Sequence, residues 1–199
     1  MELEVDDELD NWGRRRLLKA LPLTAAGLAL SASGTSAQPA TSQSSRALVA
    51  FYSRTGNTAV VARQIRRAQD ATLFEIQTRN PYPEDYEATV EQARRETAQR
   101  YLPALGNFVA DLGRYDLIYL GMPIWGMTAP PVIRSFLRAH DFSGKVVVPF
   151  ITHGGYGVGN SQEVFRTHLP AATLKPAFSM EAGQERRTLE QVSGWLDRG

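Results

Sequence analysis

The sequence predicts an α/β protein in which a parallel sheet is covered by helices on both faces. Short apolar runs alternate with helical patterns five times between residue 47 and the C-terminus. The first run, residues 47–52, is apolar at nearly every position, as expected of a strand that is buried on both faces. Such alternation implies parallel strands joined by right-handed crossovers. We therefore expect one domain with a sheet of five parallel strands.

The individual elements follow from the same two patterns in chain order. A helix is predicted at 58–69 because Val61, Ala62 and Ile65 share one face. The other predicted strands span residues 72–77, 115–121, 145–152 and, most weakly, 173–180. The other predicted helices span residues 84–100, a segment that opens at Pro130-Pro131, residues 161–169 and residues 185–196. The helix at 84–100 has Tyr86, Val90, Ala93 and Thr97 on one side.

Residues 1–37 have the pattern of a removable secretory signal peptide. A basic stretch, Arg14 to Lys19, precedes an uncharged run that ends at Ala37. This run is too short and too polar for a membrane span, which needs roughly 20 apolar residues. Arg14-Arg15 followed by Leu17-Leu18 resembles the twin-arginine export signal, which predicts a periplasmic protein without a stable membrane anchor after cleavage. An ordinary signal peptide or a disordered basic tail are the alternatives, and the acidic start of the chain departs from the usual signal.

Composition limits the remaining possibilities. Residues 38–45 are rich in Ser, Thr and Gln and are predicted to be a disordered linker to a domain at 46–199. The net charge is +1, and removal of 1–37 would raise it to +3, so nothing in the total charge suggests a nucleic-acid partner. The chain has no cysteine, which excludes disulfides, thiolate metal sites and cysteine nucleophiles. No His, Asp or Glu cluster has the spacing of metal ligands.

The loop after the first strand has the composition of a phosphate cradle. Its residues are Ser53, Arg54, Thr55, Gly56, Asn57 and Thr58. Hydroxyls, an amide side chain and successive backbone N–H groups can donate here, and the N-terminus of the following helix adds a positive partial charge. Helix capping by Thr58 alone would explain only one of these donors. The loop matches neither a Walker A loop nor the G-x-G-x-x-G fingerprint.

Two further loops follow the third and fourth predicted strands, and both contain aromatic residues and glycines. The first includes Pro123, Ile124, Trp125 and Gly126. The second includes Thr152, His153, Gly154, Gly155, Tyr156 and Gly157. A flat ligand could cover Trp125, although packing of that ring on its own core is an equal alternative. The glycines allow the backbone to approach a ligand closely.

Together the three loops resemble those of the flavodoxin-like family. Residues 53–58 resemble its phosphate-binding fingerprint, residues 123–130 its flavin-ring loop, and residues 153–161 its second ring loop. Residues 81–86 are also similar to the family. The resemblance implies a short-chain, three-layer sandwich with strand order 2-1-3-4-5, and FMN bound between strands one and three. Flavodoxins are typically acidic around the flavin, whereas this mature chain is slightly basic. The resemblance therefore does not identify the redox partner.

The resemblance implies a function with one main alternative. An electron-transfer flavoprotein would exchange electrons with a redox partner protein or a small-molecule donor or acceptor. An FMN-dependent reductase, such as an NAD(P)H:quinone oxidoreductase of the same fold, would need a second pocket over the flavin ring. The short chain favours the electron carrier. A receiver-like signalling domain would need carboxylates after the first strand, where Phe51-Tyr52-Ser53 stands instead.

Overall fold

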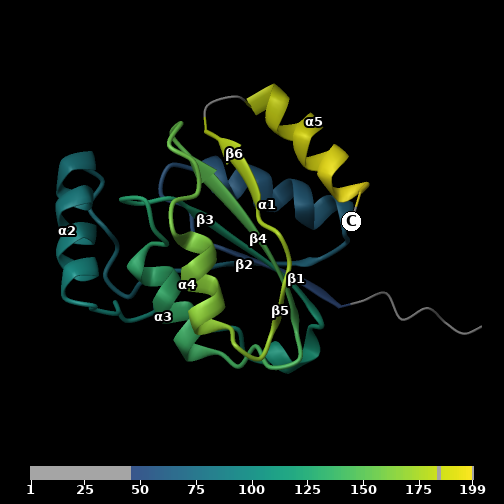
Figure 1. The fold of residues 1–199 in the computed structure, drawn as a ribbon, viewed down its shortest axis with the longest axis horizontal. Coiled ribbons are helices and arrows are strands. Elements are labelled where there is room, and N and C mark those ends of the chain that lie inside the picture. Colours follow the sequence, from purple (N-terminus) through teal and green to yellow (C-terminus); the bar gives the residue numbers. More distant parts are fainter. Residues whose placement is uncertain (1–45, 183–184, 199) are drawn as a thin grey trace, which may run out of the picture. The chain divides into compact units, whose positions relative to one another are not determined.

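The computed structural model describes residues 46–182 and 185–198, so the predicted signal peptide and linker lie outside the described residues. Figure 1 shows the arrangement of the elements in this part of the chain. The strands are β1 (Ala47–Phe51), β2 (Thr72–Glu75), β3 (Leu117–Pro123), β4 (Val146–His153), β5 (Thr173–Leu174) and β6 (Phe178–Glu181). The helices are α1 (Asn57–Ala68), α2 (Tyr86–Ala98), α3 (Pro131–Ala139), α4 (Ser161–His168) and α5 (Glu185–Leu196), with a 3₁₀ turn at Leu112–Arg114.

The sheet is parallel and its strand order is β2-β1-β3-β4-β5, which confirms the predicted topology. β1 lies between β2 and β3, and Ala50 of β1 is aligned with Phe74 on one side and Leu120 on the other. The strand order therefore reverses between β1 and β3. At such a switch point the loops after the two strands diverge and leave a crevice at the carboxyl end of the sheet.

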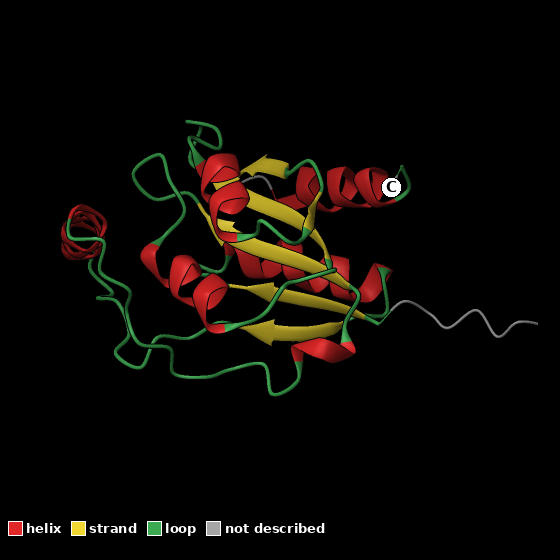
Figure 2. Ribbon diagram, turned by 60° about the horizontal axis from the view of Figure 1, so that its bottom comes forward, coloured by secondary structure: helices red, strands yellow, loops and turns green. Residues whose placement is uncertain are grey.

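Two hydrophobic cores lie on opposite faces of the sheet. Figure 2 shows helices on both sides of the strands. Alternate residues of β1 enter different cores, since Leu48 packs with Phe136 of α3 and Val49 packs with Ile65 of α1. α5 completes the second core with Val192, which is fully buried. The sheet and the helices on its two faces form three layers, which confirms the predicted sandwich.

The predicted fifth strand, residues 173–180, is interrupted in the structure. β5 and β6 both pair in parallel with β4, but they are separated by the segment from Lys175 to Ala177. Opposite this segment β4 has only Val148 and Pro149, so the fifth strand carries one extra residue there. Pro176 has no backbone N–H to donate to the ladder, which explains why the pairing stops at this point.

α2 stands apart from the layers that cover the sheet, as both ribbon views show (Figures 1 and 2). The Asp85 side chain caps it by accepting a hydrogen bond from the Ala88 N–H at 2.8 Å. The hydroxyl of Tyr82, in the segment before the helix, donates to Glu96 Oε2 at 2.6 Å. Thr89, Glu96 and Ala93 are the buried residues of the helix. α2 is thus anchored mainly to the segment that precedes it.

Candidate functional site

The loops after β1, β3 and β4 surround one cleft of about 860 Å³ at the carboxyl end of the sheet. The structure brings most of the sequence-predicted site residues together here. Those that line the cleft are Arg54, Thr55, Asn57, Thr58, Pro123, Ile124, Trp125, Gly126, Thr152, His153, Gly154 and Tyr156. Ser53, Gly56, Gly155 and Gly157 belong to the same loops but do not line the cleft.

The loop after β1 leaves backbone donors free at the start of α1. Ser53 Oγ accepts hydrogen bonds from the N–H groups of Gly56 at 3.2 Å and Ala59 at 3.3 Å. Gly56 is the N-cap, with a φ of 90° that glycine adopts readily. Within residues 46–182 and 185–198, the N–H groups of Asn57 and Thr58 donate to no protein acceptor. Free N–H groups at a helix N-terminus are what an anion such as a phosphate requires.

The two threonines of this loop have different surroundings. Thr58 is buried, and its hydroxyl shares a 2.8 Å hydrogen bond with the hydroxyl of Thr152 at the end of β4. Thr55 is exposed, and its hydroxyl accepts a hydrogen bond from Asn57 Nδ2 at 3.2 Å. Thr58 therefore joins the first loop to the third, whereas Thr55 has its hydroxyl at the surface of the cleft.

The loop after β3 forms a tight turn that presents Trp125. Trp125 and Thr128 exchange two backbone hydrogen bonds of 3.1 Å across Gly126 and Met127, whose φ angles are 53° and 65°. Positive φ at both central residues defines a type I′ turn, which is costly for a residue such as Met127. Arg134 of α3 donates from Nη2 to Thr128 Oγ1 at 2.8 Å and so fixes the end of the turn.

The Trp125 ring is half-buried and packs on other aromatic rings while it lines the cleft. It makes edge-to-face contacts with Tyr52 at 5.5 Å and with Tyr82 at 4.9 Å between ring centroids. Burial raises the pKa of the Tyr52 phenol to about 12, although the nearby Arg54 opposes the shift. Burial and the hydrogen bond to Glu96 raise the pKa of Tyr82 well above its usual range. Both phenols are therefore neutral supports for the tryptophan at ordinary pH.

The loops after β3 and β4 are in direct backbone contact. Asn160 donates its N–H to the Met127 carbonyl at 2.9 Å. A side chain at Gly159 would overlap that same carbonyl, so the approach depends on a residue without a Cβ. Nearer β4, His153 Nδ1 accepts the N–H of Gly155 at 3.2 Å. Tyr156, at 78% exposure, is the most exposed large hydrophobic side chain among the described residues.

One wall of the cleft was missed by the sequence analysis. It is formed by α2, and its lining residues are Tyr86, Thr89, Val90, Ala93, Arg94, Thr97 and Ala98. Their periodicity predicts a helix with an apolar face, and the helix is confirmed. A helix that follows a strand normally covers the sheet with such a face. In the structure it faces the cleft instead.

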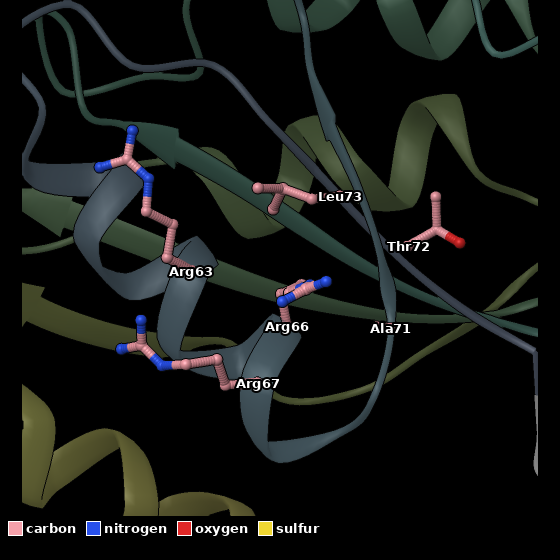
Figure 3. Close-up of a pocket in the computed structure, with 6 residues that line it drawn as sticks. All are labelled: Arg63, Arg66, Arg67, Ala71, Thr72 and Leu73. Atoms are coloured by element: carbon pink, nitrogen blue, oxygen red, sulfur yellow. The ribbon is translucent and has the colours of Figure 1, made fainter.

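A second hollow of about 660 Å³ lies between α1 and the edge strand β2 (Figure 3). It is lined by Arg63, Arg66, Arg67, Ala71, Thr72 and Leu73. The three arginines are exposed, and two of them are in the last turn of α1, far along the helix from the free N–H groups. Cations are favoured at a helix C-terminus by its dipole, which accounts for this placement without a ligand.

Two other features were looked for in the part of the chain that the structure describes. Residues 46–182 and 185–198 contain no group of three or more His, Asp or Glu side chains that could hold a metal ion. Among the same residues, no helix has the length and apolarity needed to cross a membrane.

Comparison with known proteins agrees with this geometry. A family model described as flavodoxin matches residues 46–198. A candidate flavoprotein from Bacteroides eggerthii is 31% identical, with a TM-score of 0.67, and the match covers 77% of this chain and 96% of that one. A second from Bacteroides uniformis is also 31% identical, with a TM-score of 0.68 and coverage of 76% and 97%. A flavoprotein from Lactobacillus acidophilus, solved in complex with FMN, shares the fold at 20% identity, a TM-score of 0.60 and coverage of 73% and 99%. No curated protein shows a significant match.

Proposed function

Because this chain belongs to the flavodoxin family, we propose that it binds one FMN noncovalently in the cleft and works as an electron-transfer protein. The observation that carries the proposal is the pair of free N–H groups at the start of α1, beside the hydroxyl of Thr55. This cradle suits a phosphate that is bound by dipoles and needs few full charges. The FMN complex of the Lactobacillus acidophilus protein, which has the same fold, supports the assignment.

Different residues of the cleft would contact the phosphate and the ring system of FMN. Asn57 and Thr58 would donate their N–H groups to the phosphate, while Trp125 and Tyr156 supply aromatic faces for the ring system. FMN, when bound, supplies reversible electron uptake, and the protein orients it and limits its contact with water. The neutral Tyr52 and Tyr82 hold Trp125 in position without adding charge near the ring.

The test is the visible spectrum of the purified protein. We expect yellow protein that releases stoichiometric FMN when it is denatured, because the contacts described here are all noncovalent. Colourless protein that also shows no change in flavin fluorescence when FMN is added would contradict the proposal.

A reductase that turns over a small substrate is the second candidate. Such an enzyme needs a compartment beside the flavin ring, and the α2 wall of the cleft offers one. NADH oxidation in the presence of a small acceptor would distinguish the two, since a pure carrier has no reason to bind the nicotinamide.

We further propose that the protein is exported by the twin-arginine route and works in the periplasm. The support is the sequence from Arg14 to Ala37 together with the nature of the site. The cleft is assembled from loops far apart in the chain, so only the folded protein can carry FMN out of the cytoplasm, and the twin-arginine route carries folded proteins. Replacing Arg14 and Arg15 by Lys should leave an FMN-loaded precursor in the cytoplasm. Normal processing of that variant would show that the general secretory route is used.

A further inference from the structure

We propose that the cleft binds reduced FMN more tightly than oxidised FMN, because the Arg134 guanidinium places a positive charge behind the loop after β3. This inference rests on the proposed FMN binding and adds the direction in which the protein shifts the reduction potential of the cofactor. A site that prefers the reduced form raises that potential. The loaded protein then accepts electrons from weaker reductants than free FMN does.

The Arg134 guanidinium of α3 is half-buried and lacks a counter-charge in the described part of the chain. Within residues 46–182 and 185–198 it has one hydrogen bond, from Nη2 to Thr128 Oγ1 at 2.8 Å, and no ion pair with a carboxylate. Its Nε is shielded from water and, within the same ranges, has no acceptor. Burial lowers the pKa of Arg134 from its usual value, as expected of a cation in such surroundings. A negative charge that arrives nearby would offset part of the cost of burying this cation.

This cation lies directly behind the wall of the cleft. Thr128, which accepts the Arg134 hydrogen bond, is buried and is one of the lining residues. Thr128 also closes the turn that presents Trp125, through two backbone hydrogen bonds. The first turn of α3, which begins at Pro131, adds the positive end of the helix dipole at the same place. Salt screens partly buried charges much less than exposed ones, so this positive charge acts on a ligand in the cleft.

The described lining of the cleft carries no negative charge that would oppose Arg134. Of the described residues that line it, none is Asp or Glu, and two are arginines, Arg54 and Arg94. The Arg54 guanidinium contacts neutral groups, since it donates to the Glu84 main-chain carbonyl at 3.2 Å and lies 5.6 Å from the centroid of the Tyr86 ring. Arg94 pairs with Glu91 at 3.1 Å, and both side chains are largely exposed, so Arg94 adds less.

Glu96 is a buried carboxylate on α2, but it does not belong to the cleft lining. It accepts a hydrogen bond from the Tyr82 hydroxyl at 2.6 Å. The phenol of Tyr52 is affected by charges of both signs: burial raises its pKa to about 12, and the lowering by Arg54 exceeds the further raising by Glu96. At this ring, which packs on Trp125, the cation is therefore the stronger of the two.

Reduction changes the charge of the flavin ring and leaves the phosphate as it was. The oxidised ring system is neutral, and uptake of two electrons and one proton leaves one negative charge on it. The electrons come from the redox partner protein, which loses two. A positive charge near the ring therefore stabilises the reduced form more than the oxidised one, which is how charges placed by a protein tune a flavin.

The test is the midpoint potential of the bound FMN, measured in mildly alkaline buffer with dithionite as the reductant and a redox dye as the reference. We expect a value at least about 30 mV above that of free FMN, which corresponds to tenfold tighter binding of the reduced form. Arg134→Gln should lose at least this difference, whereas Arg134→Lys keeps the charge and most of the difference. Arg138→Gln is the matched control, because it removes the same charge from an exposed position one turn further along α3.

Titration of each protein with oxidised FMN separates this inference from a purely structural role of Arg134. We expect Arg134→Gln to bind oxidised FMN nearly as tightly as the parent, since the oxidised ring is neutral. Equal weakening of oxidised and reduced FMN, or an equal fall of the potential in Arg138→Gln, would overturn the role of Arg134. A parent potential at or below that of free FMN, a measurement that needs no variant, would overturn the inference while leaving FMN binding intact. A parent that binds neither form would instead contradict the proposed function.

Discussion

At the scale of single residues, the site depends on a position at which only a residue without a side chain fits. The missing Cβ at Gly159 lets the loop after β4 lie against the Met127 carbonyl. This contact in turn supports the type I′ turn that presents Trp125. The geometry of the loops after β3 and β4 therefore depends on a residue that does not line the cleft.

Gly159→Ala should lower the free energy of unfolding by about 1–3 kcal/mol, because the backbone of Met127 would have to move and residue 159 has a φ of 51°. Gly154→Ala is the matched control, since a Cβ there meets nothing within 4 Å. Urea unfolding of the two variants measures the difference. Similar stabilities would mean that the two loops do not need this close approach.

The two threonines of the first loop should respond differently to truncation. Thr55→Ala should weaken FMN by about 1–3 kcal/mol and leave the stability of the FMN-free protein unchanged, because the Thr55 hydroxyl is exposed. Thr58→Ala should weaken FMN and also destabilise the FMN-free protein, since it leaves the Thr152 hydroxyl without its partner. Flavin titration and urea unfolding measure the two effects. A stability loss in Thr55→Ala would show that its hydroxyl has a structural role.

At the scale of elements, the sequence predicts whether a segment is a helix or a strand more accurately than it predicts the position of that element in the fold. The apolar stripe of α2 is visible as helical periodicity, so the helix could be predicted. Its place beside the cleft depends on the contact between Tyr82 and the buried Glu96, and no local pattern signals that contact. The break in the fifth strand has a visible cause in Pro176, but the extra residue opposite β4 depends on register between strands.

The two phenols that pack against Trp125, those of Tyr52 and Tyr82, should make the folded protein less stable in alkaline solution. The pKa of Tyr52 is raised to about 12 in the folded protein from an ordinary value of 10.0. Below about pH 10 the phenol is protonated in both states, and between about pH 10 and about pH 12 only the unfolded chain ionises. Tyr52 therefore contributes stability that is lost as the pH rises through this window, and the larger shift of Tyr82 acts in the same direction.

Denaturant unfolding at about pH 9 and about pH 11.5 should show this loss, and Tyr52→Phe should lose less than the parent because it has one phenol fewer. Equal losses in the parent and in the variant would mean that the Tyr52 phenol is accessible enough to ionise in the folded state.

At the scale of the whole molecule, the alternation of apolar runs and helical patterns predicts a parallel sheet with helices on both faces, and the resemblance to the flavodoxin-like family implies the strand order. Parallel crossovers leave few arrangements, and the switch-point rule then places the loops after β1 and β3 side by side. The width of the cleft could not be predicted, because it depends on how far α2 lies from the sheet. The fold therefore identifies the edge of the sheet at which the cleft lies, and the structure adds α2 as a further wall of that cleft.

The most direct test of the account is the affinity of the FMN-free protein for FMN compared with riboflavin, measured by flavin fluorescence. The two ligands share the ring system and differ in the phosphate. If the free N–H groups of Asn57 and Thr58 bind that phosphate, FMN should bind at least about tenfold more tightly, a difference of about 1.4 kcal/mol. Equal affinity for the two flavins would show that the loop after β1 does not bind the phosphate and would contradict the central claim.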